Sequence, residues 1–226
     1  MSDANEGGAR TLGGGAHSSN SFRRKAEGLG PSVYVDLDRT LFQTSRTEEI
    51  WQAVEQLYPA IDANEQSARA TEFHTDTPYG YCYDFFAQLK SLGIDSNDAR
   101  RRLLTLPLAD GRLQFDGEAE LVAWLNERAD VTILSFGKRD YQSFKQALCP
   151  ALDGIPLETV MGSKGEWLAD KGECWLIDDK PQTDLPPNVR FIQVSLEGKE
   201  VVSQPWLVLT SLADVKEYLS HNIDKP

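Results

Sequence analysis

Apolar and polar residues follow two different rhythms along this chain. Short runs rich in apolar, β-branched and aromatic residues recur through much of the sequence, separated by polar or amphipathic segments. Runs of this length and composition predict buried strands, because a central strand of a parallel sheet is covered on both faces. Five runs have this character: 33–35, 131–134, 157–161, 173–177 and 189–194.

From residue 115 onward, amphipathic segments alternate with these runs. Helices are expected over about 116–125, 140–148, 164–169 and 211–220. Strands that alternate with helices indicate an α/β fold, here a Rossmann-like parallel sheet with helices on both faces. In such a sheet, ligands bind at the carboxyl ends of the strands.

Residues 45–113 follow the helical rhythm instead. Apolar side chains in 50–58 recur at i, i+3, i+4 and i+7 spacing, and further helices are expected over 64–73 and 81–92. No strand-like alternation is evident, and the stretch is longer than an ordinary crossover connection. We therefore expect an all-helical domain, residues 45–113, inserted into a core domain formed by residues 30–44 and 114–226.

The first 29 residues differ from the rest in composition. They contain Gly7-Gly8, Gly13-Gly14-Gly15 and a Ser-rich tract at 18–21, with few large apolar side chains. Such a segment buries too little surface to offset the loss of chain entropy, so residues 1–29 are predicted to be a disordered tail.

The net charge of −12 argues against partners that are polyanions, namely nucleic-acid polymers and anionic membrane surfaces. No apolar run approaches the roughly 20 residues that a transmembrane helix needs. The three cysteines, Cys82, Cys149 and Cys174, have no metal-site spacing and suit buried thiols in a reducing compartment. We therefore expect a cytoplasmic protein without nucleic-acid or membrane partners.

Polar residues follow four of the predicted strands. They are Asp36 and Asp38 after the first, Ser135 after the second, Lys164 after the third, and Asp178-Asp179 after the fourth. Two carboxylates at the end of a buried strand are unfavourable unless a cation neutralises them. Carboxylates, a hydroxyl and an ammonium group together can hold Mg²⁺ and a phosphoryl group.

These residues resemble the motifs of the haloacid dehalogenase (HAD) superfamily of phosphohydrolases, and they occur in the family's order. The four matches are Asp36-Leu37-Asp38-Arg39-Thr40, Ile133-Leu134-Ser135-Phe136-Gly137, Gly162-Ser163-Lys164-Gly165 and Leu176-Ile177-Asp178-Asp179. One position departs from the family, which usually has Gly where this chain has Arg39.

The resemblance implies a role for each motif residue. Asp36 would be the nucleophile that forms an aspartyl-phosphate, and Asp38 would act as general acid and base. Mg²⁺ would be bound by the Asp36 carboxylate, the Asp38 backbone carbonyl, and Asp178 or Asp179. Lys164 would neutralise charge on Asp36 and on the phosphate.

The remaining motif residues would contact the substrate. Thr40 would steady the first loop, and Ser135, Phe136 and Gly137 would surround the phosphoryl group together with Lys164. Within the family, Asp38 favours a phosphatase over a dehalogenase, because a departing halide needs no proton.

The inserted residues fall where this superfamily places its helical C1-type cap. The resemblance implies a lid over a small phosphorylated metabolite. The arginines at 100–102 are interpreted as a solvated helix face, and the tyrosines within 79–83 as core of the cap. Lys138 and Arg139, just beyond Ser135, would add positive potential near the site.

Three alternatives remain open. A phosphomutase or phosphotransferase would use the same covalent step, and a non-catalytic HAD-like protein would bind a phospho-ligand without turnover. A response-regulator receiver uses similar groups but places its acidic pair on the first strand and its phospho-accepting Asp on the third. Here the adjacent pair Asp178-Asp179 comes last and a large insert intervenes, an order that disfavours a receiver. The sequence leaves the substrate, the direct metal ligand among Asp178 and Asp179, and the oligomeric state open.

Overall fold

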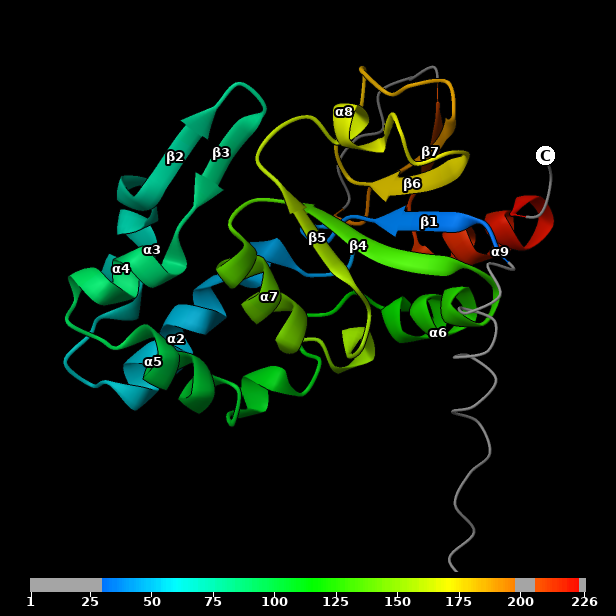
Figure 1. The fold of residues 1–226 in the computed structure, drawn as a ribbon. Helices are drawn as coiled ribbons and strands as arrows, with labels where there is room; N and C mark the ends of the chain where they lie inside the picture. Colours follow the sequence, from blue (N-terminus) through cyan, green and yellow to red (C-terminus); the bar gives the residue numbers. More distant parts are fainter. Residues whose placement is uncertain (1–29, 198–205, 224–226) are drawn as a thin grey trace, which may run out of the picture.

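A six-stranded parallel sheet forms the centre of the computed structural model, which describes residues 30–197 and 206–223 (Figure 1). The strand order is β5-β4-β1-β6-β7-β8. The strands are β1 (Ser32–Val35), β4 (Asp130–Phe136), β5 (Leu157–Val160), β6 (Cys174–Asp178), β7 (Val189–Val194) and β8 (Leu207–Leu209). The predicted parallel α/β fold is confirmed, and the predicted disordered tail, residues 1–29, lies outside the described residues.

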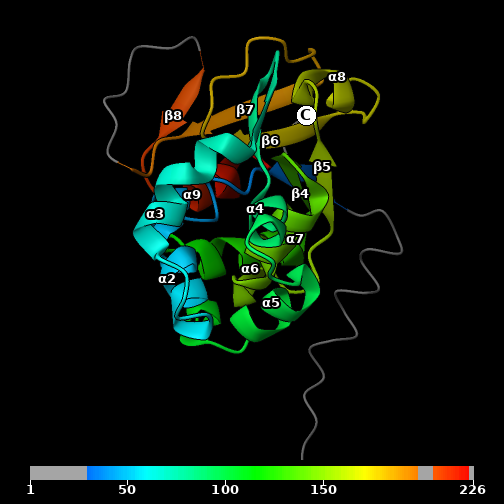
Figure 2. The same ribbon diagram turned by 90° about the vertical axis from the view of Figure 1, so that its left-hand side faces the viewer.

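Helices cover both faces of this sheet, as the alternation of side chains along the strands requires. Val33 and Val35 of β1 belong to a large apolar cluster, whereas Tyr34 between them belongs to a second cluster on the opposite face. The large cluster includes side chains of α6 (Glu118–Arg128), α7 (Arg139–Ala147) and α9 (Leu212–Asn222), and the second includes Leu168 of α8 (Lys164–Leu168). Figures 1 and 2 show α8 on the side of the sheet opposite α6 and α7.

The insert, residues 45–113, lies between β1 and β4 in the sequence and beside α7 in space (Figure 1). Its α-helices are α2 (Glu48–Leu57), α3 (Ala63–Ala68), α4 (Phe85–Ser91) and α5 (Ser96–Leu103). Short 3₁₀ turns occur at Thr44–Arg46, Arg69–Phe73 and Pro107–Ala109. The division of the chain into two domains at 45 and 113 stays a prediction.

The expectation of an all-helical insert is wrong at 74–83. Two strands, β2 (His74–Thr77) and β3 (Gly80–Tyr83), form an antiparallel hairpin there, and α4 begins only at Phe85. Pro78 and Gly80 at the turn disfavour a helix, and Gly80 has a φ of 134°. The Thr77 hydroxyl closes the turn by donating to the Gly80 carbonyl at 2.7 Å. Alternating Thr and Tyr side chains in two four-residue strands are too short a pattern to stand out from the helical background.

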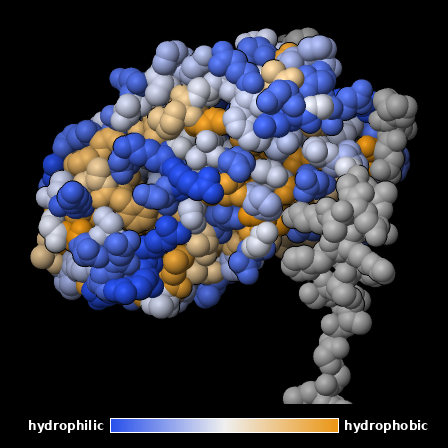
Figure 3. Space-filling model, viewed as in Figure 1, coloured by the Kyte–Doolittle hydropathy of each residue, from blue (hydrophilic) through white to orange (hydrophobic). Residues whose placement is uncertain are grey.

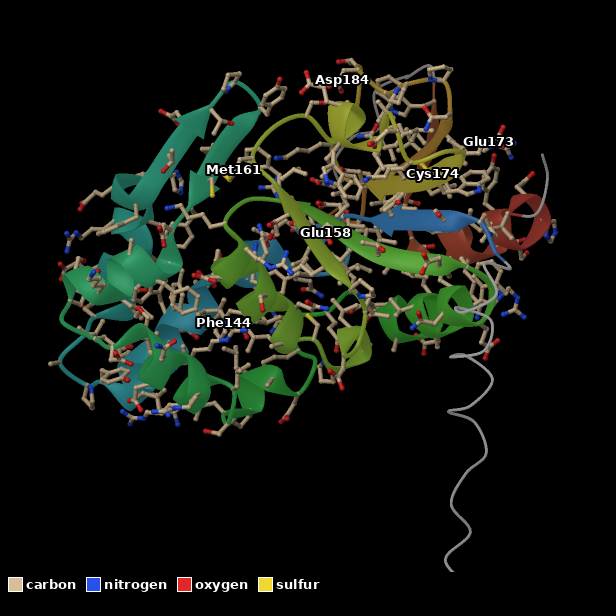
Figure 4. The ribbon with its side chains drawn as sticks, viewed as in Figure 1. Phe144, Glu158, Met161, Glu173, Cys174 and Asp184 are labelled. Carbon is tan, nitrogen blue, oxygen red and sulfur yellow. The ribbon has the colours of Figure 1, made fainter. Side chains whose placement is uncertain are left out.

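Aromatic side chains join the insert to α7. Phe85 of α4 lies between Trp51 of the insert and Phe144 of α7, with ring centroids 5.2 and 5.7 Å away. Phe144, labelled in Figure 4, projects from α7 into this group, and Tyr141 stacks on Phe85 at 5.4 Å. Because one apolar cluster contains side chains from both segments, the insert is packed firmly against the sheet domain.

On the face of the molecule that Figure 3 shows, hydrophobic residues form patches among hydrophilic ones. The cysteines at 82, 149 and 174 are all buried free thiols. Among the described residues, no helix combines the length and apolar character needed to cross a bilayer.

Glu118, in the first turn of α6, is a buried acid whose side chain should make stability depend on pH. It is only 1% exposed, and burial raises its pKa from 4.5 to about 8, with Gln114 offsetting part of the effect. Between these pH values the folded state keeps a proton that the unfolded state has lost. The free energy of unfolding should therefore fall as pH rises from about 4.5 to about 8.

We expect Glu118→Gln to remove this pH-dependent part of the free energy of unfolding. Urea denaturation at pH 5 and pH 8 should show that the variant loses less stability across this range than the wild type does. The matched control is Glu120→Gln, an exposed acid in the same turn. An equal loss in wild type and Glu118→Gln would contradict the prediction.

Candidate active site

Lys164 lies between two carboxylates at the carboxyl edge of the sheet. Its Nζ atom is 2.6 Å from Asp36 Oδ1 and 2.6 Å from Asp178 Oδ2, and all three side chains are at least nine-tenths buried. Asp36 directly follows β1, Asp178 ends β6, and Lys164 begins α8, whose N-cap is the Ser163 side chain. The neighbouring positions of β1 and β6 in the sheet bring the two acids together.

A third carboxylate, that of Asp179, completes this acidic cluster. Asp36, Asp178 and Asp179 each offer one oxygen, and the three atoms lie within 4.8 Å of one another. Burial raises the pKa of Asp36 well above its usual range despite the attraction of Lys164, and burial together with Asp178 raises the pKa of Asp179 to about 6. One ammonium group is therefore too little positive charge for three acids.

The acidic cluster fits a bound divalent cation. Its oxygen donors are of the kind that Mg²⁺ prefers, and a cation would stabilise the ionised carboxylates against the burial and mutual repulsion that raise these pKa values. The Asp178 carboxylate is already engaged by Lys164, the Lys180 backbone N–H at 2.8 Å and Gln182 at 3.1 Å. By contrast, the structure shows no hydrogen bond to the Asp179 carboxylate from the described residues, so its lone pairs are the more available.

Two cavities meet at this edge. The first, the acidic cavity, has a volume of about 350 Å³ and is lined by the acidic cluster, Lys164 and Asp38. Asp184, labelled in Figure 4, lines it beside α8, and Tyr79 lines it from the hairpin tip. The second, the aromatic cavity, has a volume of about 340 Å³ and lies between the insert and α7. Asp38, Phe136, Asp179 and Lys180 line both cavities.

Asp38 is held by three side chains that the sequence motifs do not include. Lys145 Nζ lies 2.5 Å from both carboxylate oxygens, the Thr44 hydroxyl donates at 2.8 Å, and Gln142 Nε2 donates at 3.1 Å. Burial favours a raised pKa for Asp38, but the charge and hydrogen bond of Lys145, with those of Thr44 and Gln142, outweigh it and lower the pKa. The Asp38 carboxylate is therefore ionised and fixed in position.

Sequence reasoning missed Lys145 and Gln142, although α7 carries a signal for Lys145. Lys145 follows Tyr141 by four residues and precedes Leu148 by three, which places it on the apolar face of the helix. A lysine on that face is 3% exposed here, with its ammonium group 4.7 Å from the Tyr141 ring centre. A charged residue at a core position of the helix that follows β4 is the pattern to look for.

The predicted phosphate contacts lie at the expected strand end. Ser135 and Thr40 are fully buried, and their hydroxyl groups have no partner among the residues that the structure describes. Phe136 lines both cavities and Gly137 lines the aromatic one. Gly137 has a φ of 135°, and a Cβ atom there would lie 2.6 Å from Gln142 Nε2, so this position requires glycine.

Arg39 occupies a left-handed backbone conformation, with a φ of 61°. A side chain in this region costs about 1–2 kcal/mol relative to glycine, and the conformation explains why glycine is usual at this motif position. The Arg39 N–H donates to the Phe42 carbonyl at 2.8 Å, which stabilises the turn. Its guanidinium group lines the aromatic cavity and pairs with Glu197 at 3.8 Å.

Lys138, Arg139 and the arginines at 100–102, which the sequence singled out, line neither cavity. Lys138 forms an ion pair with Asp84 of the insert at 2.5 Å, and Arg139 lies 3.9 Å from Glu158, which is labelled in Figure 4. The arginines at 100–102 contact Ser143, Asp98 and Tyr58 and line neither cavity, as the interpretation of a solvated helix face predicted.

The interpretation of the tyrosines as core of the cap is wrong for two of the three. Tyr79 and Tyr81 are 47% and 63% exposed, whereas Tyr83 is largely covered and hydrogen-bonds to Gln88. Side chains alternate along β3, so Tyr81 and Tyr83 share one face of the hairpin. The difference follows from position along the strand, because Tyr83 ends β3 beside α4 and packs against Phe85 and Tyr141.

Comparison with solved structures identifies the fold. The chain is similar to a haloacid dehalogenase-like hydrolase from Burkholderia xenovorans LB400, with a TM-score of 0.59 and 16% identity over 85% of this chain and 98% of the other. It is also similar to a HAD phosphatase from Thermococcus onnurineus (TM-score 0.54, 14% identity, 85% and 99% covered) and to a magnesium-bound HAD hydrolase from Bacillus subtilis (0.53, 16%, 84% and 98%). No protein-family model and no curated protein matches the sequence. The chain has the haloacid dehalogenase-like hydrolase fold, as its four motifs predicted.

We expect Lys145 and Asp38 to be strongly coupled in stability. Lys145→Met leaves a largely buried carboxylate without its cation, whereas the double variant Lys145→Met/Asp38→Asn also removes the charge. The losses of unfolding free energy in the single variants Lys145→Met and Asp38→Asn, added together, should therefore exceed the loss in the double variant by about 1–3 kcal/mol. Urea denaturation at pH 7 measures all three. Additive losses would show that the ion pair contributes little.

Proposed function

We propose that this protein is a Mg²⁺-dependent phosphohydrolase that cleaves a small phosphate monoester through an aspartyl-phosphate. The observation that carries this proposal is the acidic cluster around Lys164, at the carboxyl edge of a parallel sheet with the HAD-like hydrolase fold. A buried carboxylate beside an ammonium group and an open cavity is the arrangement that an attack on phosphorus needs.

Asp36 is the proposed nucleophile. Its second carboxylate oxygen is not engaged by Lys164, whose ammonium group contacts Oδ1. Attack on phosphorus gives an aspartyl-phosphate and releases the alkoxide of the substrate. Lys164 remains protonated, because Asp178 and Asp36 raise its pKa despite burial, and so balances negative charge on the phosphoryl oxygens. The buried Ser135 hydroxyl, which lacks a partner among the described residues, is available to donate to one of these oxygens.

The proposed metal ligands are the Asp36 carboxylate, the Asp38 backbone carbonyl and the Asp179 carboxylate, with Asp178 beside them. Bound Mg²⁺ would keep Asp36 ionised and reduce the repulsion between it and the phosphate. A HAD hydrolase with the same fold has been crystallised with magnesium, which supports the choice of metal.

Asp38 is the proposed general acid and base. Its ionised form, fixed by Lys145, is ready to take a proton from the water that hydrolyses the aspartyl-phosphate. Protonation of the leaving alkoxide requires the opposite state. An anionic phosphate entering the adjacent cavity favours that state, because a nearby negative charge raises the pKa of a carboxyl group. Asp38 lines both cavities and is therefore placed between the phosphoryl group and the leaving group.

The fold also occurs in a haloacid dehalogenase from Xanthobacter autotrophicus, with a TM-score of 0.50 and 14% identity. Two features favour phosphoryl transfer here. A departing halide needs no proton, so Asp38 would have no task in a dehalogenase, and a carboxylate-rich cluster would be unnecessary without a cation.

The insert is proposed to act as the cap of the C1 type. Its hairpin reaches over the site. A Cβ atom on Gly162 would lie 4.0 Å from the Tyr79 ring, and a Cβ atom on Gly80 would lie 4.0 Å from the Phe136 ring. An aromatic cavity of about 340 Å³ has room for a small metabolite but not for a folded protein or a nucleic-acid helix.

We expect the purified protein to release inorganic phosphate from at least one member of a panel of phosphorylated metabolites when Mg²⁺ is present. Chelation of the metal should abolish release. Asp36→Asn should lower kcat by at least about a thousandfold, because it removes the nucleophile. Asp170→Asn, which changes an exposed acid after α8, is the matched control.

Two outcomes would contradict this proposal. Failure of the wild type to release phosphate from any ester would do so, as would equal rates in wild type and Asp36→Asn. Transfer of the phosphoryl group to a second hydroxyl without net phosphate release would identify a phosphomutase.

We expect Asp38→Asn to impair both halves of the reaction by about 10²- to 10⁴-fold, because an amide neither gives up a proton to the alkoxide nor takes one from water. Acid quenching during turnover of a labelled substrate should detect aspartyl-phosphate that decays slowly. Normal steady-state rates in this variant would argue against Asp38 as acid and base.

A further inference from the structure

The aromatic cavity has walls made largely of rings. Seven of its lining side chains are aromatic or heteroaromatic: Trp51, His74, Tyr81, Tyr83, Phe85, Phe136 and Tyr141. They come from α2, the hairpin, α4, the end of β4 and α7, so several elements of the wall contribute rings. Flat rings on several walls favour a flat and apolar occupant.

The insert contributes no charge to this cavity. Among the lining residues from 44 to 85 there is no Asp, Glu, Lys or Arg. The charged lining residues all come from outside the insert. Lys145 is paired with Asp38 and Arg39 with Glu197, and Lys180 lines the acidic cavity as well. A second anionic group on the substrate would therefore find no cation on the insert itself.

Several polar groups of the cavity are also engaged. The Tyr83 hydroxyl donates to Gln88 at 2.6 Å, the Thr47 hydroxyl donates to the Thr44 carbonyl at 3.0 Å, and the Thr44 hydroxyl donates to Asp38. Recognition of a sugar requires several free donors and acceptors, because each buried hydroxyl group of the ligand must be paired. This cavity is poorly equipped for that task.

Tyr81 is the least covered of these rings. It is 63% exposed, yet its ring stacks on His74 with centroids 4.6 Å apart and an interplanar angle of 14°. The imidazole ring thus holds a large exposed phenol in a defined orientation at the cavity wall. A bound aromatic group would cover this ring and extend the stack.

We propose that the leaving group of the substrate is an uncharged aromatic ring, carbocyclic or heterocyclic, carried on the esterified alcohol. This inference rests on the proposed phosphohydrolase function. The phosphoryl group occupies the acidic cavity, the ester oxygen lies near Asp38 where the two cavities meet, and the ring enters the aromatic cavity beside Tyr81.

The test compares four phosphate esters of primary alcohols. Benzyl phosphate and cyclohexylmethyl phosphate are both esters of primary alcohols with the same carbon skeleton, but only the first is flat and aromatic. 3-Phosphoglycerate adds a carboxylate, and glycerol 3-phosphate offers hydroxyl groups. With Mg²⁺, kcat/KM for benzyl phosphate should exceed that for each of the other three by about tenfold.

A second set of measurements does not depend on turnover. The non-hydrolysable 2-phenylethylphosphonate should bind more tightly than 2-cyclohexylethylphosphonate in calorimetry. Tyr81→Leu keeps an apolar side chain but removes the ring, and should reduce both preferences at least threefold. Tyr58→Leu is the matched control, because Tyr58 belongs to the insert but lines neither cavity.

The outcomes separate the two proposals. Hydrolysis of all four esters at similar rates, or a preference for 3-phosphoglycerate or glycerol 3-phosphate, would overturn the aromatic leaving group and leave the phosphohydrolase function standing. Unchanged preferences in Tyr81→Leu would also overturn it. Hydrolysis of none of the esters, with no phosphonate bound, would overturn both.

Discussion

The contact of one ammonium group with two buried carboxylates is the interaction on which this site depends. Lys164 is the only lysine or arginine with a direct ion pair to Asp36 or Asp178 in the described part of the chain, and it begins a helix on the face opposite α7. Without its charge, three acids would meet at one sheet edge in a medium of low polarity. With it, the cluster keeps a negative excess, which is the condition for attracting a metal ion and then a phosphate.

A second ion pair at the same edge of the sheet makes Asp38 differ from Asp36. Lys145 approaches Asp38 from α7, so the two carboxylates that are separated by one residue in the sequence experience different surroundings. Burial and neighbouring acids raise the pKa of Asp36, whereas Lys145 and two hydrogen bonds lower that of Asp38. Two helices on opposite faces of the sheet thus each supply one lysine to this motif. Lys164 of α8 pairs with Asp36, and Lys145 of α7 pairs with Asp38.

The sequence predicts the parts of this structure that depend on local pattern and strand ends. Asp36, Ser135, Lys164 and Asp178 could be found because parallel strands bring their carboxyl ends to one edge. Lys145 belongs to no motif, and its importance follows from the packing of α7 against the turn after β1. The hairpin at 74–83 and the three-residue strand β8 are too short for periodicity to reveal. The contrast between Tyr81 and Tyr83, which share one face of that hairpin, depends on the tertiary packing of its α4 end, where Tyr83 meets Phe85 and Tyr141.

The left-handed turn at Arg39 has a consequence for how such a site can diversify. The backbone there keeps the shape that glycine would adopt, held by the Arg39–Phe42 hydrogen bond, although a large side chain is present. The side chain at position 39 can therefore change without moving the Asp36 carboxylate. A substitution there would alter the group that meets the incoming molecule and leave the nucleophile in place. The conformational penalty at that position is smallest for glycine, moderate for Asn and Asp and largest for β-branched side chains. Variation there therefore exchanges a cost in stability for a change in selectivity.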